Sequence, residues 1–253
     1  MRAKIREMEK GLFLIDDAGD STCYLLCGET GALLVDTLNG EEDLKEIVSG
    51  LTELPVTVVN THGHCDHIGG NIFFDEAWIH PADEALAKSH FAFMAEGFAR
   101  FGRTPCPFRF LSIGQVFDLG GITAEVVPLS GHTPGSVGLL CREKRLLFTG
   151  DGMNPHIWMQ LEESLPIRAL EESLLHVKEA FFGEYDRVLF GHAQDYLDKG
   201  ILDRLLKGCR ELRAGQRQRD TEYVYFDGQA RALQHPYGEK PVGDVIVYTE
   251  EKL

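Results

Sequence analysis

Three histidines and an aspartate lie within six positions of the segment NTHGHCDHIGG, residues 60–70. They are His62, His64, Asp66 and His67. Imidazole nitrogens and carboxylate oxygens are side-chain atoms that bind Zn²⁺ in proteins. A packing role explains one buried histidine but not four such residues, so the spacing predicts a metal site. By itself the motif is also compatible with a chance polar loop.

Three further residues of the same kinds stand beside glycine, each after an apolar run. His132 occurs in SGHTPGS, Asp151 in LLFTGDG and His192 in VLFGHAQD. Glycine permits the close backbone turns that bring distant segments together. The repeated context argues against a chance loop and for one site assembled from several strand ends.

Seven ligand-type residues suit two adjacent divalent ions that share one ligand. The predicted sets are His62, His64 and His132 for the first ion, Asp66, His67 and His192 for the second, and Asp151 bridging both. A hydroxide held between two cations is acidified and becomes a nucleophile. The pattern therefore predicts a dinuclear metal-dependent hydrolase with a metal-bridging hydroxide. Zinc is the expected ion, with iron and manganese as alternatives.

The elements that must position these residues are strands and helices in alternation. VTVVN (56–60) is a buried strand directly before the first motif, which places that motif at a strand's carboxyl end. Apolar runs and turn residues predict the other strands, and helical periodicity predicts the helices. Strands are expected at 11–17, 21–30, 31–37, 115–120, 122–130, 137–143, 144–150, 187–192, 221–227 and 244–250, and helices at 41–54, 165–182 and 196–215.

Residues 82–113 differ from the segments around them because they begin with helical periodicity and are rich in aromatic residues. The large apolar side chains are Phe91, Phe93, Met94, Phe98, Phe101, Phe108 and Phe110. We expect a helical aromatic insertion at about 82–113 that packs in the core, with a partial lid over the site as the alternative. No linker divides the chain, so residues 1–253 are expected to form one domain.

The order THGHCDHIGG, GHTPGSVGL, FTGD and FGH resembles the metallo-β-lactamase superfamily, from about residue 11 to residue 195. The resemblance implies an α/β fold, an αββα sandwich of two mixed β-sheets with helices on the outer faces. It places the site at one edge of the two sheets and implies the ligand sets given above. It also implies that Asp66 orients the hydroxide or takes a proton.

Some branches of that family fit the chain better than others. The antibiotic-hydrolysing enzymes with a cysteine ligand carry it where this chain has Asp151, which disfavours that branch. The GHTPGS block most resembles hydroxyacylglutathione hydrolases and lactonases, which open thioesters or esters. The basic residues with which glutathione-using enzymes hold their substrate have no evident counterpart, and lactonase relatives have a tyrosine where this chain has Asn154. The predicted substrate is a small ester, thioester or lactone.

Other reactions remain as alternatives. One is an iron-dependent redox enzyme of the same fold acting on a persulfide or dioxygen, and another is a phosphodiester hydrolase. The presence of all seven ligand-type residues favours two metals over the single-iron dioxygenases. A non-catalytic binding protein would be expected to have lost ligands.

Residues near the motifs are candidates for substrate contact. Asn154, His156 and Trp158 follow Asp151 closely and are expected to bind substrate, with a loop that packs on itself as the alternative. Cys65 is predicted to be an inert packed thiol. The remaining histidines are expected to be ordinary surface or core residues, namely His80, His90, His176 and His235.

Composition limits the partners. Lys and Arg number 25 against 40 Asp and Glu, a net charge of −15, which disfavours nucleic acid. The N-terminal segment has neither a signal-peptide nor a membrane-span pattern, so no membrane is expected. Six cysteines without a CxxC pair suggest free thiols and a cytoplasmic location. A small-molecule substrate is expected, and the sequence does not indicate an oligomeric state.

Overall fold

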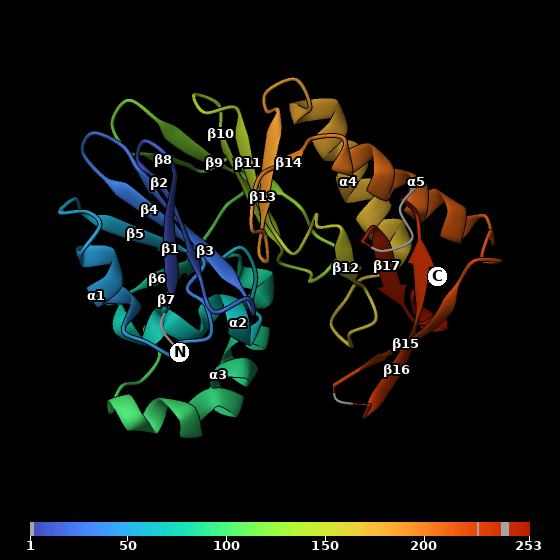
Figure 1. The fold of residues 1–253 in the computed structure, drawn as a ribbon, viewed down its shortest axis with the longest axis horizontal. Coiled ribbons are helices and arrows are strands. Elements are labelled where there is room, and N and C mark those ends of the chain that lie inside the picture. The colour runs from blue at the N-terminus through green and yellow to red at the C-terminus, as the bar shows by residue number, and fades with distance from the viewer. Residues whose placement is uncertain (1–2, 227, 239–242) are drawn as a thin grey trace.

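The computed structural model describes residues 3–226, 228–238 and 243–253. Two large β-sheets face each other with helices on their outer sides, and a third, smaller sheet lies beside them (Figure 1). The α-helices are α1 (Leu44–Ser49), α2 (Cys65–Ile68), α3 (Glu84–Phe98), α4 (Ile167–Phe181) and α5 (Ile201–Arg213). Short 3₁₀ helices span Gly69–Phe73, Pro81–Asp83, Ala99–Phe101 and Glu250–Lys252.

The first sheet has seven strands in chain order. They are β1 (Lys4–Glu9), β2 (Leu12–Asp16), β3 (Thr22–Cys27), β4 (Ala32–Val35), β5 (Val56–Val59), β6 (Ala77–Ile79) and β7 (Phe108–Phe110). β1 to β4 pair antiparallel, whereas β4 to β7 pair parallel. β4 and β5 therefore end at the same edge, where the first motif begins.

The second sheet has six strands in the order β14-β13-β11-β10-β9-β8. They are β8 (Val116–Asp118), β9 (Thr123–Pro128), β10 (Val137–Cys141), β11 (Leu146–Gly150), β13 (Arg187–Phe190) and β14 (Leu197–Asp198). β11 and β13 are parallel neighbours, so the residues that follow them meet at one edge. A hydrogen bond from Val137 N to Thr61 O (2.9 Å) joins this edge to the first sheet.

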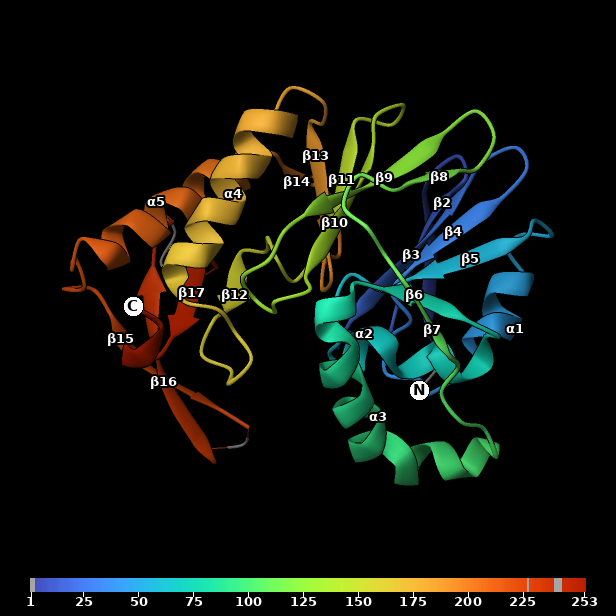
Figure 2. The ribbon, with the colours of Figure 1, turned by 180° about the vertical axis from the view of Figure 1, so that it is seen from behind.

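The third sheet lies near the C-terminus on the other side of the site from α3 (Figures 1 and 2). Its strands are β12 (His156–Trp158), β17 (Val245–Tyr248), β16 (Ala230–Pro236) and β15 (Thr221–Tyr225), in that order. β12 pairs parallel with β17, and β15 and β16 form an antiparallel hairpin. This sheet puts a late part of the chain beside residues that follow Asp151.

Three apolar clusters hold the layers together. The cluster between the large sheets includes Leu14, Val126 and Phe148. A second cluster packs the outer face of the first sheet against α1 and α3, and a third packs the second sheet against α4 and α5. The layers are thus helix, sheet, sheet and helix, which confirms the predicted αββα sandwich of two mixed β-sheets.

The sequence-based elements agree with the structure where the local pattern is strong. The expected strand at 56–60 is β5, and the helix at 165–182 is α4. Two predicted helices are too long, because α1 covers only Leu44–Ser49 of 41–54 and α5 begins at Ile201 rather than 196. The strand expected at 221–227 is β15, and its last position lies outside the described residues. β1, β6, β12, β16 and the pairing that makes a third sheet were not predicted, and β7 and β14 lie in segments that were predicted to be helical.

The aromatic segment divides between helix and strand. α3 buries Phe91 and Phe98 against the first sheet, which confirms core packing for these two rings. Phe93 points away and is 84% exposed. The end of the segment forms β7, which pairs parallel with β6 at the edge of the sheet. Within the described part of the chain, none of the helices combines the length and apolar character that crossing a bilayer requires.

Candidate metal centre

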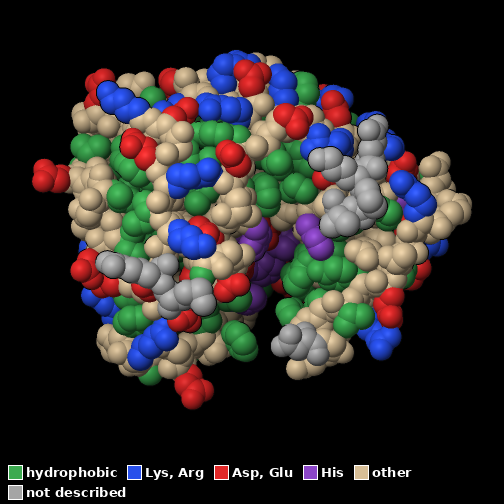
Figure 3. Space-filling view, viewed as in Figure 1, with side chains coloured by type: hydrophobic (Ala, Val, Ile, Leu, Met, Phe, Trp, Pro, Cys, Tyr) green, Lys and Arg blue, Asp and Glu red, His purple; other side chains and the backbone are tan. Residues whose placement is uncertain are grey.

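The seven predicted ligand residues meet at one edge of the two large sheets. His62 and His64 follow β5, Asp66 and His67 lie on α2, His132 is in the loop between β9 and β10, Asp151 follows β11, and His192 follows β13. Three of these positions are the carboxyl ends of strands that have a parallel neighbour. The space-filling view shows histidines at the base of a hollow there (Figure 3).

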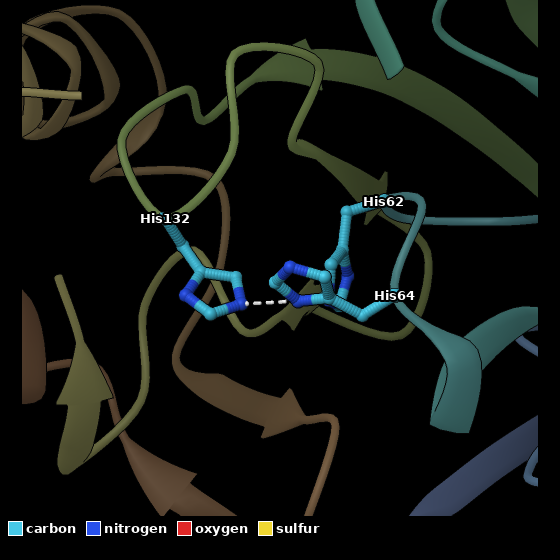
Figure 4. A group of neighbouring side chains, drawn as sticks. All are labelled: His62, His64 and His132. Atoms are coloured by element: carbon cyan, nitrogen blue, oxygen red, sulfur yellow. Dashed lines mark hydrogen bonds between the residues drawn. The ribbon is translucent and has the colours of Figure 1, made fainter. Parts of the chain in front are cut away.

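The first group consists of three buried histidines (Figure 4). His64 Nδ1 lies 3.1 Å from His62 Nε2 and 2.9 Å from His132 Nε2. Three nitrogens from two different loops therefore converge on one point. This is the geometry in which three imidazoles hold one ion.

The second group lies beside the first. His67 Nε2 is 3.2 Å from Asp66 Oδ2, and His192 Nε2 is 3.6 Å from the same oxygen. Asp151 Oδ2 lies 3.1 Å from His192 Nε2, 3.7 Å from His67 Nε2 and 3.8 Å from His132 Nε2. One oxygen of Asp151 is thus close to nitrogens of both groups.

Each histidine of the two groups has its other ring nitrogen engaged outside the site, which fixes the direction of its lone pair. The partners are Thr61 Oγ1 for His62 (3.0 Å), Glu163 for His64 (2.6 Å), Asp36 for His67 (3.0 Å), the Trp158 carbonyl for His132 (2.7 Å) and the Asp20 carbonyl for His192 (2.5 Å). Carbonyls and carboxylates only accept hydrogen bonds, and the Thr61 hydroxyl already donates its proton to Asp36, so all five imidazoles donate outward. Their remaining nitrogens then direct lone pairs at one another, an arrangement that a bound cation relieves.

Asp36 organises the site from outside although the sequence did not single it out. Its carboxylate accepts from Thr61 N (2.7 Å), Thr61 Oγ1 (2.8 Å) and His67 Nδ1 (3.0 Å). The residue is buried and has φ of 63°, a left-handed conformation that aspartate adopts more readily than most residues. An aspartate after a strand also fits an ordinary turn, which is why the sequence pattern did not identify it.

Asp83 joins two of the loops and was likewise not predicted. This buried carboxylate accepts hydrogen bonds from Gly63 N (2.9 Å), Gly135 N (2.6 Å) and Thr133 Oγ1 (2.6 Å). It therefore holds the loop after β5 against the loop before β10. The two loops carry the histidines of the first group.

Gly191 shows how tightly the strand ends approach. A Cβ atom at this position would lie 2.3 Å from His67 Cε1 and 2.6 Å from Asp151 Oδ1. No side chain fits at such distances, so only glycine lets β13 end beside the two ligand-type residues.

Two buried polar atoms at the site lack a hydrogen-bond partner. They are His67 Nε2 and Asp151 Oδ1. Buried polar atoms are normally satisfied, so unpaired atoms at the centre of a ligand cluster point to a missing partner such as a metal ion. The residues present therefore fit a divalent cation.

The electrostatics of the two groups differ. Burial lowers the pKa of His62, and burial with the neighbouring His64 lowers the pKa of His132 to about 4. Burial also opposes charge on His67 and His192, but nearby carboxylates raise the pKa of His67 well above its usual value and that of His192 to about 9. His62 and His132 are thus neutral at pH 7, whereas His67 and His192 favour the protonated form.

A cavity of about 680 Å³ opens onto both groups. Asn154, His156 and Trp158, the residues predicted to contact substrate, line it. Among the described residues that line it, none is lysine or arginine, and the carboxylates are Asp66, Asp151, Glu162 and Glu163. The cavity is therefore acidic and aromatic rather than basic.

Some lining residues correct the sequence-based expectations. Cys65 was expected to be packed away, yet it is half-buried and lines the cavity, because it begins α2 instead of lying in an extended loop. His90 was expected to be an ordinary histidine, but it also lines the cavity and accepts from Cys65 N (2.9 Å). The aromatic residues Tyr223, Tyr225 and Phe226 were missed because only the pairing of the third sheet brings them here.

The lid alternative for α3 receives little support. Phe93 and Phe98 line a separate cavity of about 340 Å³, together with Cys65 and Arg100. Only His90 of α3 is among the residues that line the larger cavity. The helix thus borders the site through His90 and not through its phenylalanines.

Sequence comparisons find named relatives. A protein of Haemophilus influenzae named hydroxyacylglutathione hydrolase GloC is 32% identical over 134 residues, which cover 49% of this chain and 61% of that protein. Human acyl-coenzyme A thioesterase MBLAC2 is 25% identical over 239 residues, 80% of this chain and 79% of that protein. The match thus spans about three fifths of the bacterial relative and four fifths of the human one.

Solved structures share the fold at low identity. The sec-alkylsulfatase Pisa1 from a Pseudomonas species has a TM-score of 0.67 and 15% identity over 84% of this chain and 42% of that one. The DIM-1 metallo-beta-lactamase has a TM-score of 0.63 and 16% identity over 84% and 99%. The family model described as the metallo-beta-lactamase superfamily matches residues 16–192, which include all seven ligand-type residues. The chain therefore belongs to the metallo-β-lactamase superfamily.

Proposed function

We propose that this chain is a dinuclear metal-dependent hydrolase of a small ester or thioester. In this proposal one divalent ion is held by His62, His64 and His132, a second by Asp66, His67 and His192, and Asp151 contacts both. The observation that carries the proposal is the position of Asp151 Oδ2, within 3.8 Å of His132, 3.7 Å of His67 and 3.1 Å of His192.

Zinc suits the donor set best. The proposed ligands are imidazole nitrogens and carboxylate oxygens without a thiolate, and Zn²⁺ binds both donor types. Iron and manganese accept the same donors and remain alternatives. The outward hydrogen bonds of the five histidines support any of these ions because they fix the ligand tautomers.

When bound, such ions would acidify water and polarise the carbonyl of the substrate. The chain supplies the remaining functions through its own side chains. Asp66, a member of the second group, lines the cavity, and its carboxylate would orient the attacking water or accept its proton. Asn154, His156 and Trp158 form one side of the space in which the acyl group would lie.

The names of the relatives favour an ester or thioester over other bonds. The Haemophilus influenzae protein is named for hydroxyacylglutathione and the human protein for acyl-coenzyme A, and both names denote thioester hydrolysis. Among the described residues that line the cavity there is no lysine or arginine to pair with phosphate groups, so a substrate smaller and less anionic than coenzyme A suits it better.

Metal content tests the proposed ligand sets. The purified protein should carry close to two ions per chain, and Asp151→Ala should lower occupancy of both positions because its carboxylate is shared. Asp195→Ala is a matched control, since Asp195 is an exposed carboxylate close in sequence to His192 that pairs with Arg6 (4.0 Å) and accepts from Tyr196 N (2.8 Å). Full metal content in Asp151→Ala would refute the bridging role. Retained iron with strong visible absorption would favour the redox alternative.

Single-turnover hydrolysis in ¹⁸O-labelled water tests the reaction. A panel of thioester, ester, lactone and phosphodiester substrates, each with Zn²⁺, Mn²⁺ or Fe²⁺, identifies the substrate class first. Because no protein nucleophile is proposed, the product acid should carry the label on the first turnover. An unlabelled first turnover would show a covalent acyl-enzyme, and cleavage of phosphodiesters alone would replace the proposed substrate class.

A further inference from the structure

Four aromatic residues form one wall of the 680 Å³ cavity. They are Trp158 of β12, Tyr223 and Tyr225 of β15, and Phe226 just after β15. We call these four residues the aromatic wall. The indole of Trp158 is central, with ring centroids 6.2 Å from Tyr223, 5.5 Å from Tyr225 and 6.0 Å from Phe226, all at steep interplanar angles.

Strand periodicity explains why the wall faces the cavity. Tyr223 and Tyr225 are two residues apart on β15 and therefore share one face of the third sheet. Val224 between them is 49% exposed and does not line the cavity. On β17, Ile246 and Tyr248 pack in the cluster that contains α4 and α5, whereas Val245 and Val247 lie in the small cluster beneath the wall. The wall is thus the face of the sheet that the helices leave uncovered.

The wall and the ligand-type residues belong to one space. His192, Asp151 and the four aromatic residues line the same cavity. The backbone also joins them, because the Trp158 carbonyl accepts the hydrogen bond from His132 Nδ1 (2.7 Å). A substrate whose scissile bond lies at the ligand-type residues would therefore reach the aromatic wall.

The charges around the wall limit what it can hold. The described lining residues include four carboxylates and no lysine or arginine. The four wall residues themselves carry no charge, so the wall offers a charged group no ion pair to replace the hydration that it would lose there. Aromatic faces and edges instead attract another ring, which adds to the gain from burying apolar area. The chemistry that matches the wall is an uncharged aromatic ring.

We propose that the aromatic wall is a specificity site that binds an uncharged aromatic ring of the substrate. This rests on the proposed hydrolase function, because it assumes that the bond to be cleaved lies at the ligand-type residues. Trp158 supplies the central contact, and the tyrosines of β15 hold the ring from the side. Substrates with a phenyl group should therefore be preferred over equally large saturated ones.

Direct binding can be followed through Trp158 without any turnover. The chain has two tryptophans, and the other, Trp78, packs against Phe117 and does not line the cavity. In a Trp78→Phe background all tryptophan fluorescence comes from the wall. The metal-loaded protein is titrated with phenylacetamide, with cyclohexylacetamide as the saturated analogue and acetamide as the control for the amide group.

Phenylacetamide should change the fluorescence of Trp158 saturably, cyclohexylacetamide should bind more weakly, and acetamide should have no effect. Tyr225→Leu should weaken phenylacetamide binding by about three- to tenfold, the size expected when an aromatic contact is lost. Val224→Leu is the matched control, because it alters the opposite face of the same strand and should leave the affinity unchanged. Thermal unfolding shows whether both variants are folded. Tyr223→Leu is used instead of Tyr225→Leu if the latter does not fold.

Equal affinity in Tyr225→Leu and Val224→Leu, or equal affinity for the phenyl and cyclohexyl ligands, would overturn the proposal. The same variants are then assayed with phenylacetyl and acetyl thioesters. In Tyr225→Leu, kcat/KM should fall for the phenylacetyl thioester and stay unchanged for the acetyl thioester. Ring binding that depends on Tyr225 without hydrolysis of either thioester would support the wall and reject the hydrolase function. Hydrolysis of the phenylacetyl thioester with unchanged kcat/KM in Tyr225→Leu would support the hydrolase function and reject the aromatic wall as a specificity site.

Discussion

At the scale of single residues, Asp36 shows how a side chain outside the ligand sets controls the site. Asp36→Asn keeps a residue that tolerates φ of 63° but replaces one acceptor oxygen by an amide donor. Because Asp36 holds both Thr61 and His67, metal affinity should fall about 10–100-fold, the usual effect of losing such a partner. Competition with a chelator measures this affinity.

The control for Asp36→Asn is Asp16→Asn. Asp16 is also a buried carboxylate, but within the described residues it accepts from Gly19 N and not from Thr61 or a ligand-type residue. Unchanged metal affinity in Asp36→Asn, or an equal loss in Asp16→Asn, would contradict the organising role.

Cys65 provides a second prediction at this scale, because it lines the cavity and is the thiol nearest the site. Burial raises its pKa, so at pH 7 the fraction of reactive thiolate is below that of an ordinary cysteine. Cys65→Ser should therefore leave turnover within a few-fold, whereas Asp66→Ala should reduce it by orders of magnitude. Steady-state assays test both, and loss of turnover in Cys65→Ser at full metal content would indicate a thiol nucleophile.

The ligand residues were predictable because each carries its own local signal. His132, Asp151 and His192 follow apolar runs and stand beside glycine, so the sequence shows both their chemistry and their place at a strand end. Asp36 also follows a strand, but no sequence pattern distinguishes it, since aspartate after a strand is also a common turn residue. Its role follows only from the contacts it makes.

At the scale of elements, α3 offers a matched pair of phenylalanines on one helix. Phe98 is 4% exposed and packs in the cluster under the first sheet, whereas Phe93 is 84% exposed. Phe98→Ala should lower the free energy of unfolding by about 3–5 kcal/mol, and Phe93→Ala should change it by less than about 0.5 kcal/mol. Denaturant unfolding measures both, and equal effects would contradict the core role of Phe98.

The elements that the sequence did not reveal depend on distant pairing. β1 has mostly exposed, charged residues at the edge of its sheet and lacks an apolar run. β16 is short of buried residues and is identified only by its partners β15 and β17. The third sheet therefore escaped prediction, and with it the position of Tyr223 and Tyr225 in the cavity.

At the scale of the whole molecule, the candidate metal centre lies between the two large sheets and takes residues from both. His62 and His64 leave the first sheet, while His132, Asp151 and His192 belong to the second. A ligand that binds only the folded state stabilises it by about 2.7 kcal/mol at a hundredfold excess over its dissociation constant. Chelation should thus lower the melting temperature of the wild-type protein. In Asp151→Ala the melting temperature should fall much less on chelation. Equal shifts of the melting temperature in both proteins would contradict a metal centre that links the sheets.

The aromatic wall has a consequence for how this chain could acquire new substrates. Residues 16–192 match the superfamily and contain every ligand-type residue, whereas Tyr223, Tyr225 and Phe226 come from a later hairpin. The reacting groups and three of the four recognition groups are therefore encoded in separate stretches of the gene. With the aromatic wall acting as proposed, exchange of the β15–β16 hairpin alone would change substrate selectivity and leave the ligand-type residues unaltered, which makes this hairpin a unit for evolution and engineering of selectivity.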